Sequence, residues 1–217
     1  MELKEKIVSS YVAFENKVDI NSAIHDIRTE ALENFEKIGF PTKKLEAWKY
    51  TNLNSVLKND FSIFLNKDNT VELSDVKKYF IHDIDTYKIV FIDGKYSSFL
   101  SETTHDDLDV CLMSSALSKP KYKAVIENYF NKIAKPDNLT SLNTAFASEG
   151  AYIHIPRNVE VEKPIQIINF TTGSEAATMT QPRNLIVVDE NAHVQIIERH
   201  QSLTSNPVLS NVVTEIF

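Results

Sequence analysis

Apolar residues change their spacing near Gly150. Upstream they recur mostly at helical intervals, and downstream they alternate with polar residues, as in residues 152–155. Alternation with a period of two, rich in Val and Ile, is typical of short β-strands. The pattern predicts a mainly helical front region, residues 1–140, followed by an all-β rear region, residues 141–217.

A short motif repeats inside the rear region. Residues 153–161 are similar to residues 186–194, with Asn158 and Asn191 at the same internal position. Asn tolerates the left-handed backbone conformation that a sharp corner needs, so it replaces glycine there. Short alternating strands that recur around an Asn corner favour the stacked coils of a parallel β-helix. Two copies make a short repeat, and a β-sandwich is the alternative.

The front region contains three apolar stripes at helical spacing. They predict helices over residues 3–14, 24–38 and 122–134. Gly39 lies directly after the second stripe, with Pro41 close behind, and this combination is a strong helix stop. The front region is therefore expected to be mainly helical.

Turn and cap signals complete the front region. The Asp93-Gly94 pair between apolar runs predicts a β-hairpin near residues 87–100. Asp137 or Thr140 is placed to cap a last short helix before the strands begin. Because no Gly/Ser-rich or Pro-rich linker follows, we expect the front and rear regions to pack together.

The sequence stops within an apolar, strand-like segment, residues 211–217. A stacked β-structure that ends in this way exposes unpaired backbone groups and apolar side chains. Either another subunit covers that end, or the chain is the front part of a longer protein. We expect the second explanation, and hence a truncated β-helix.

Composition is that of an ordinary globular protein, and 217 residues suffice for one large domain or two small ones. The net charge of −7 argues against binding to duplex nucleic acid, which calls for a basic face. No apolar run approaches the roughly 18 residues that a membrane span needs, and the charged start leads into no signal-peptide core. With its single cysteine, Cys111, the sequence predicts a cytoplasmic protein without an intrachain disulfide.

The common catalytic motifs are absent from the sequence. Its four glycines build no phosphate-binding loop, no serine lies in a GxSxG turn, and one cysteine excludes CxxC pairs. Cys111 has apolar neighbours and is interpreted as a small buried residue, not a nucleophile. Trp48 and Tyr50 are interpreted as rings that pack against their own domain, with a binding patch as the alternative.

The six histidines are the remaining source of reactive groups. His154 and His193 lie near matching corners of the repeat, and stacking would begin a metal site, although a surface ladder is favoured. Glu198, Arg199 and His200 are interpreted as marking a strand that leaves the core. Three histidines adjoin carboxylates, which seldom converge on one ion from neighbouring positions, and these are interpreted as solvated surface: His25-Asp26, His82-Asp83 and His105-Asp106-Asp107.

Several segments of the chain are familiar in combination. Residues 44–53 contain the element Glu-x-Trp-Lys-Tyr-Thr-x-Leu, and residues 90–100 contain the hairpin around Asp-Gly. Residues 142–156, 161–165 and 183–198 follow in order. Together these segments resemble the SufB/SufD family of the SUF iron–sulfur cluster assembly system, and the Trp-Lys-Tyr element favours its SufD-like branch.

The resemblance implies both a fold and a role. The implied fold is an N-terminal helical region, then a right-handed parallel β-helix of which this chain holds only the first coils. The implied role is that of a non-catalytic scaffold subunit in a SufBCD-like complex, which pairs with a SufB-like paralogue, meets a SufC-like ATPase and supports iron delivery. In the family, the residues implicated in cluster chemistry lie beyond Phe217. The sequence therefore assigns no catalytic, cofactor-binding or metal residue, and clusters are expected on the wider complex, not on this fragment.

Two other function classes stay open at this point. A polysaccharide-active β-helix enzyme needs acidic groups gathered in a groove and is normally secreted, whereas the acidic residues here are dispersed and no export signal is present. A homo-oligomeric structural module would pair a strand edge with a copy of itself.

Overall fold

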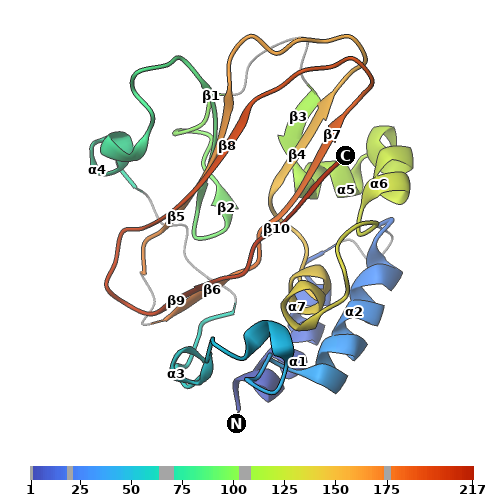
Figure 1. Ribbon diagram of the computed structural model, residues 1–217, viewed down its shortest axis with the longest axis vertical. Coiled ribbons are helices and arrows are strands. Elements are labelled where there is room, and N and C mark those ends of the chain that lie inside the picture. The colour runs from blue at the N-terminus through green and yellow to red at the C-terminus, as the bar shows by residue number, and fades with distance from the viewer. Residues whose placement is uncertain (1, 19–21, 64–70, 103–108, 174–176) are drawn as a thin grey trace.

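The computed structural model describes residues 2–18, 22–63, 71–102, 109–173 and 177–217. Helices gather at one end and along the sides of a group of sheets (Figure 1). The mixed α and β class expected from the sequence is confirmed. None of the helices in the described ranges is long and apolar enough to cross a membrane.

Two long helices begin the chain, α1 (Leu3–Glu15) and α2 (His25–Ile38). The predicted stop of α2 is confirmed, because Gly39 has φ of +61° and its N–H donates to the Phe35 carbonyl at 2.7 Å. Glycine accepts this left-handed conformation without a side-chain clash. The predicted stripe of α1 is buried and consists of Leu3, Ile7, Tyr11 and Phe14.

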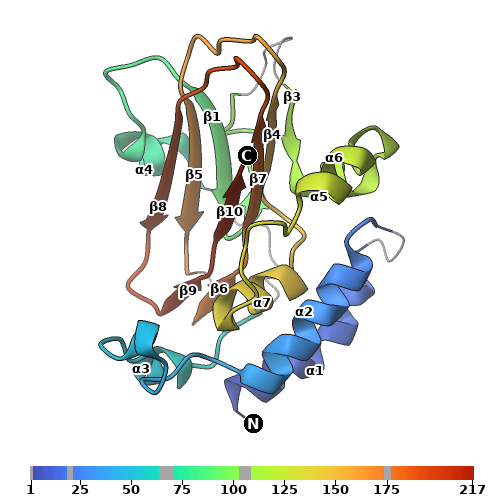
Figure 2. The same cartoon turned by 45° about the vertical axis from the view of Figure 1, so that its right-hand side comes forward.

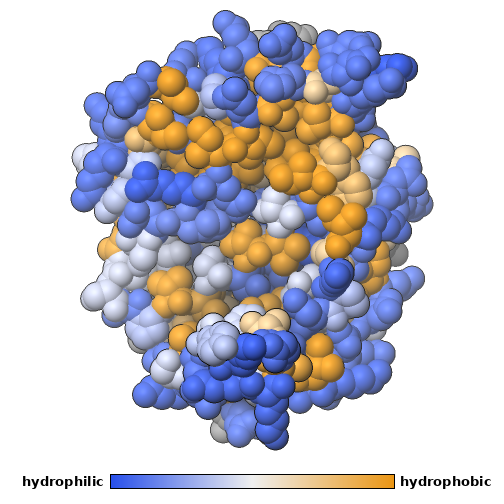
Figure 3. All heavy atoms as spheres, in the orientation of Figure 1, coloured by the Kyte–Doolittle hydropathy of each residue, from blue (hydrophilic) through white to orange (hydrophobic). Residues whose placement is uncertain are grey.

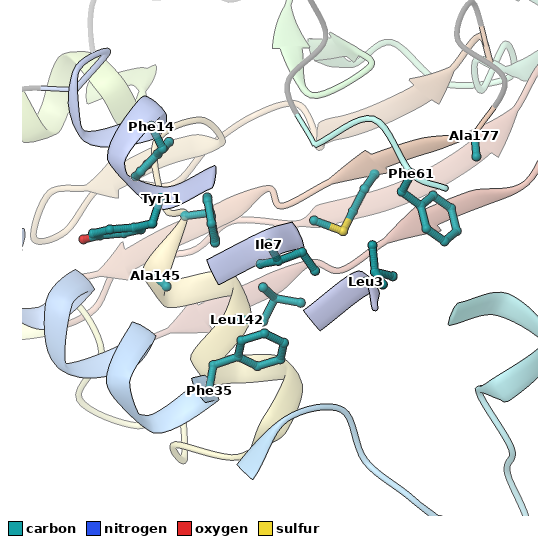
Figure 4. Close-up of a cluster of buried hydrophobic side chains, with 11 residues drawn as sticks. Leu3, Ile7, Tyr11, Phe14, Phe35, Phe61, Leu142, Ala145 and Ala177 are labelled. Atoms are coloured by element: carbon teal, nitrogen blue, oxygen red, sulfur yellow. The ribbon is translucent and has the colours of Figure 1, made fainter. Parts of the chain in front are cut away.

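A third helix, α7 (Asn138–Ala145), lies between the long helices and the strands (Figure 2). Its cap is Asp137, whose carboxylate accepts the N–H of Thr140 at 2.8 Å. Figure 4 shows the core beneath these helices, where Phe35 of α2 and Leu142 of α7 face the stripe of α1. The apolar stripe of α1 thus packs against α2 and α7 and against side chains from the strand region.

Short elements connect this helical end to the sheets. The hairpin predicted near residues 87–100 is present, with Asp93 and Gly94 both at positive φ between two antiparallel strands. The second strand of the hairpin ends at Tyr96, earlier than predicted. The elements between α2 and α7 are η1 (Glu46–Trp48), α3 (Asn54–Leu57), α4 (Leu73–Val76), η2 (Lys77–Tyr79), β1 (Tyr87–Ile92), β2 (Lys95–Tyr96), β3 (Asp109–Leu112), α5 (Met113–Ser118), η3 (Pro120–Tyr122) and α6 (Lys123–Tyr129).

Beyond Gly150 the strands follow one another in rounds. Each strand of the second round pairs in parallel with its counterpart in the first, so β4–β7, β5–β8 and β6–β9 are neighbours, and β10 then pairs with β7. We call β4, β5 and β6 the first round, and β7, β8 and β9 the second. Their bounds are β4 (Ala151–Ile155), β5 (Ile165–Thr171), β6 (Thr178–Thr180), β7 (Arg183–Val188), β8 (Ile196–Ser202), β9 (Val208–Ser210) and β10 (Val213–Ile216).

The repeat predicted around an Asn corner is present in the structure. Asn158 and Asn191 have φ of 62° and 59°, and the Nδ2 of Asn191 donates to the Oδ1 of Asn158 at 3.3 Å, 33 positions apart. At the other end of a round, Thr180 donates to Ser210 across 30 positions. Successive rounds therefore stack corner on corner and strand on strand.

Segments of the front region cover the free edge of the first round. β1 pairs in parallel with β5, and β3 pairs antiparallel with β4. Ser62 bridges to Thr178 of β6, with its N–H bonded to the Ala177 carbonyl at 2.9 Å. All three strands of the first round thus have a partner on each side. Whether residues 1–140 and 141–217 are separate domains stays a prediction.

The sheets enclose an aliphatic core between them. Ile153 of β4, Ile167 of β5 and Ile186 of β7 are each fully buried in it, together with Ile89 and Phe91 of β1. We call the side of the strands that carries these residues the enclosed face. The opposite sides are covered by α5 and α6 on one sheet and by the α4 segment on the other.

A buried ion pair joins the sheets to the α6 segment. Arg183 and Glu215 are 0% and 2% exposed, and their side chains meet at 2.6 Å. Glu215 also accepts the backbone N–H groups of Asn131, Ile133 and Ala134 at 2.7–3.1 Å. The helix predicted over residues 122–134 is wrong in extent for this reason: α6 ends at Tyr129, because the N–H groups that would continue it bind Glu215 instead.

Candidate functional site

The outer side of β3 and β4 carries a cluster of polar groups. The antiparallel register places Asp109 opposite His154. The Nε2 of His154 lies 3.0 Å from Oδ2 of Asp189, just beyond β7. On the same face, Tyr122 donates its hydroxyl to Asp109 at 2.8 Å. His154 therefore has an acidic partner that its position between two isoleucines did not indicate.

Cys111 lies beside this cluster, opposite Tyr152, and is half-buried. Burial raises the pKa of its thiol above the ordinary range, and the hydrogen bond with Tyr122 only partly offsets this effect. The pKa of Tyr152 is also raised by burial. These groups stay protonated at neutral pH, which does not favour nucleophilic chemistry.

The alternative in which His154 and His193 stack to begin a metal site, which the sequence analysis did not favour, is excluded. The strand register places Val187 beside His154 and Glu160 beside His193, so the two rings occupy different positions in the repeat. Of the residue pairs interpreted as surface, His25-Asp26 and His82-Asp83 form no metal-binding group, and His105-Asp106-Asp107 lie outside the described residues. Within the described ranges, no group of three or more His, Cys, Asp or Glu side chains is placed to hold a metal ion.

Glu198 and His200 form a second polar cluster, on β8. The interpretation that these residues and Arg199 mark a strand leaving the core agrees with their exposure, since all three are exposed while β8 remains paired with β5 as far as Ser202. Glu198 and His200 lie two and four positions after Ile196 in β8. Side chains two positions apart in a strand point to the same face, so all three lie on the enclosed face. Arg199 points the other way and donates to the carbonyl of Tyr79 at 2.8 Å.

The Glu198 carboxylate is bonded from two sheets. His200 lies 3.0 Å from its Oε1, Asn184 of β7 donates to the same atom at 3.3 Å, and Thr214 of β10 donates to Oε2 at 3.1 Å. Desolvation raises the pKa of this carboxyl, but the His200 and Thr214 contacts outweigh desolvation and hold the pKa below its usual value. Sequence alternation signals the shared face, but no local pattern reveals the partners on β7 and β10.

Trp48 and Tyr50 were interpreted as rings that pack against their own domain, and Tyr50 does not. Tyr50 is 90% exposed, and the Lys49 ammonium lies 5.0 Å from the centroid of its ring. Trp48 is half-buried at the end of η1. The Tyr50 ring therefore does not pack into its own domain.

A cavity of about 880 Å³ lies where the helical end meets the first round of strands. Its walls include Phe14, Lys95, Glu149 and Gln181. Burial raises the pKa of the Glu149 carboxyl, with a smaller opposing effect from its hydrogen bond with Ser114. The walls of this cavity mix apolar and charged side chains from the front region and from the first round.

Strands β8 and β9 of the second round, together with β10, form an open edge. Within the described residues, β8, β9 and β10 each have a strand partner on one side only. Hydrophobic side chains gather over the part of this face where β8 and β10 lie (Figure 3). The exposed fraction of Ile216, on the enclosed face of β10, is 57%. The backbone groups on the free side of these strands therefore have no strand partner among the described residues.

Comparison with known proteins agrees with this geometry. The family model described as "SufBD protein N-terminal region" matches residues 1–167, most of the chain. The chain belongs to the SufBD family. The match spans the helical front, strand β4 and the first residues of β5.

Individual members of the SufBD family share about a quarter of their residues with this chain. An iron–sulfur cluster assembly SufBD family protein of Synechocystis is 26% identical over 91% of this chain and 45% of its own length. The iron–sulfur cluster assembly proteins SufD and SufB of Bacillus subtilis are 24% and 28% identical over 94% and 80% of this chain, and 47% and 39% of their own lengths. The chain thus spans about half the length of the curated relatives it matches.

Proposed function

We propose that the chain is the N-terminal part of a SufD-like subunit of an iron–sulfur cluster assembly scaffold. In this role it is cytoplasmic and non-catalytic, pairs with a SufB-like paralogue and supports iron delivery, while a SufC-like ATPase joins through the remainder of the protein. The observation that carries the proposal is the match to the SufBD N-terminal region over residues 1–167. SufD relatives from two bacteria cover 94% and 79% of the chain.

The proposal includes a fold, a right-handed parallel β-helix of which these strands are the first coils. Parallel pairing between strands 30–33 positions apart supports stacked coils. The right hand is favoured because connections between parallel strands of one sheet are right-handed in about 98% of cases. In this arrangement the front segments cap the first coil, and the open edge receives further coils.

Replacement of the matching half of a relative tests the assignment. Residues 1–217 would be joined to the second half of Bacillus subtilis SufD and expressed in cells depleted of their own SufD. We expect the chimera to co-purify with SufB and SufC and to restore the activity of an iron–sulfur enzyme. The unmodified SufD is the control for expression and recovery.

Two results would contradict the proposal. One is a folded chimera that forms only homodimers by light scattering, which would favour the homo-oligomeric module. The other is a chimera that enters the complex but restores no iron–sulfur enzyme activity. Release of unsaturated products from uronic-acid polymers by the purified chain would favour a polysaccharide-active enzyme.

A further inference from the structure

The enclosed face of the strands changes character from the first round to the second. In β5 this face carries Ile165 and Ile167, both fully buried. In β8 the register continues it through Ile196 to Glu198 and His200. The buried Ile167 of the first round is therefore followed by the carboxylate of Glu198 in the second, and Asn169 is followed by the imidazole of His200. Polar groups on such a face need partners or a ligand.

Glu198 and His200 are spaced as two ligands of one cation. The Glu198 Oε1 and the His200 Nε2 are 3.0 Å apart. Two atoms bound at right angles to an ion, each at about 2.1 Å, are separated by about this distance. Thr214 and Asn184 hold the carboxylate from the opposite sheet and so fix its orientation. The side chains of Glu198 and His200 are 26% and 41% exposed, which leaves room for an ion to reach them.

Asn169 supplies an independent observation that points to a ligand. It is the register neighbour of His200 on β5 and lies on the same enclosed face. Only 7% of its surface is exposed, yet neither its Oδ1 nor its Nδ2 has a hydrogen-bond partner among the described residues. Burying an amide without hydrogen-bond partners is unfavourable, so such groups normally mark a bound water or ion.

We propose that Asn169, Glu198 and His200 form a binding site for a divalent transition-metal ion. A carboxylate, a neutral imidazole and an amide oxygen suit ions of the Mn²⁺ to Zn²⁺ series, with water in the remaining positions. Arg199 does not oppose the ion, because it points to the other side of β8. The site goes beyond the proposed scaffold role and departs from the sequence-based expectation that this fragment binds no metal.

The test uses Co²⁺ as the probe, added to the purified chain and followed by visible absorption and calorimetry. We expect Glu198→Gln and His200→Gln each to weaken Co²⁺ binding at least tenfold. Both glutamines keep a hydrogen-bonding side chain, so thermal melting without metal should be almost unchanged. Asn169→Asp should strengthen binding at least fivefold, a gain that misfolding cannot produce.

Matched controls separate this site from other polar pairs. Arg199→Gln changes the opposite side of the same strand, and His154→Gln removes a histidine with an equal 3.0 Å contact to a carboxylate but no unpartnered amide beside it. Both should bind Co²⁺ as the unaltered chain does. Equal affinity in the Glu198 and His200 variants, or an equal loss in His154→Gln, would overturn the proposal. An Asn169→Leu variant with unchanged affinity would overturn the role of Asn169.

Discussion

Gly150 lies where the backbone of Arg183 passes close to the start of the strands. Its φ is +147°, and a Cβ added there would lie 2.0 Å from the carbonyl oxygen of Arg183. Backbone atoms cannot move aside as the end of a side chain does. The glycine at this position is therefore required by the approach of the strand that opens the second round.

The substitution Gly150→Ala is expected to destabilise the protein by more than about 3 kcal/mol, because strain at an unusual φ adds to a backbone clash. Urea unfolding followed by circular dichroism measures the change. Gly39→Ala is the control: its Cβ would meet only the flexible Lys4 side chain at 3.3 Å, so its cost should stay within about 1–3 kcal/mol, the cost of an unusual backbone conformation. Equal losses in the two variants would show that the contact at Gly150 relaxes.

Single residues also show what the sequence reveals and what it hides. Asn158 and Asn191 were identifiable because a corner leaves a local sign, a residue that tolerates positive φ, at the same place in both copies. Glu198 and His200 are exposed, as charged side chains normally are, but the sequence did not reveal what they contact. Two partners of Glu198, Asn184 and Thr214, come from other strands. A contact between two segments far apart in the sequence produces no periodic pattern in the sequence of either segment.

At the scale of elements, helices and turns depend on local sequence and were predictable, whereas the pairing of strands depends on distant segments and was not. The stripe of α1, the stop of α2 and the Asp93-Gly94 turn were predicted because each depends on residues close in sequence. The pairing of β1 with β5 was not predicted, since the partners are separated by the whole α7 segment. The same reason explains α6, whose early end depends on Glu215 of β10.

The ion pair between β7 and β10 should be the most sensitive contact between elements. Arg183→Met leaves the Glu215 carboxylate buried without its cation, and breaking such a pair costs about 3–5 kcal/mol. Chemical denaturation measures this cost. Arg157→Met is the control, since it breaks an exposed pair with Glu190, and its cost should stay below about 1 kcal/mol. A small loss in Arg183→Met would mean that Glu215 is held by the backbone N–H groups alone.

At the scale of the whole molecule, the two ends of the strand stack differ. At one end β1, β3 and Ser62 cover the first round, and at the other β8, β9 and β10 are open among the described strands. The front region is therefore not an appendage to the sheets. It supplies the backbone partners that the first strands need.

Deletion of residues 1–140 is accordingly expected to leave residues 141–217 insoluble, because the edges of β4, β5 and β6 lose their partners together. Solubility after expression and the thermal unfolding curve are the measurements. A soluble fragment that melts in one cooperative transition would contradict the capping role of the front region.

The difference between the two ends also bears on the order in which the chain folds. Synthesis delivers β1 and β3 before the strands that they pair with, and N-terminal segments generally fold first as a chain emerges. Each later strand can then pair with a strand of the preceding round that has already folded. Folding during translation can advance strand by strand from the covered end, with a single growing edge at any moment.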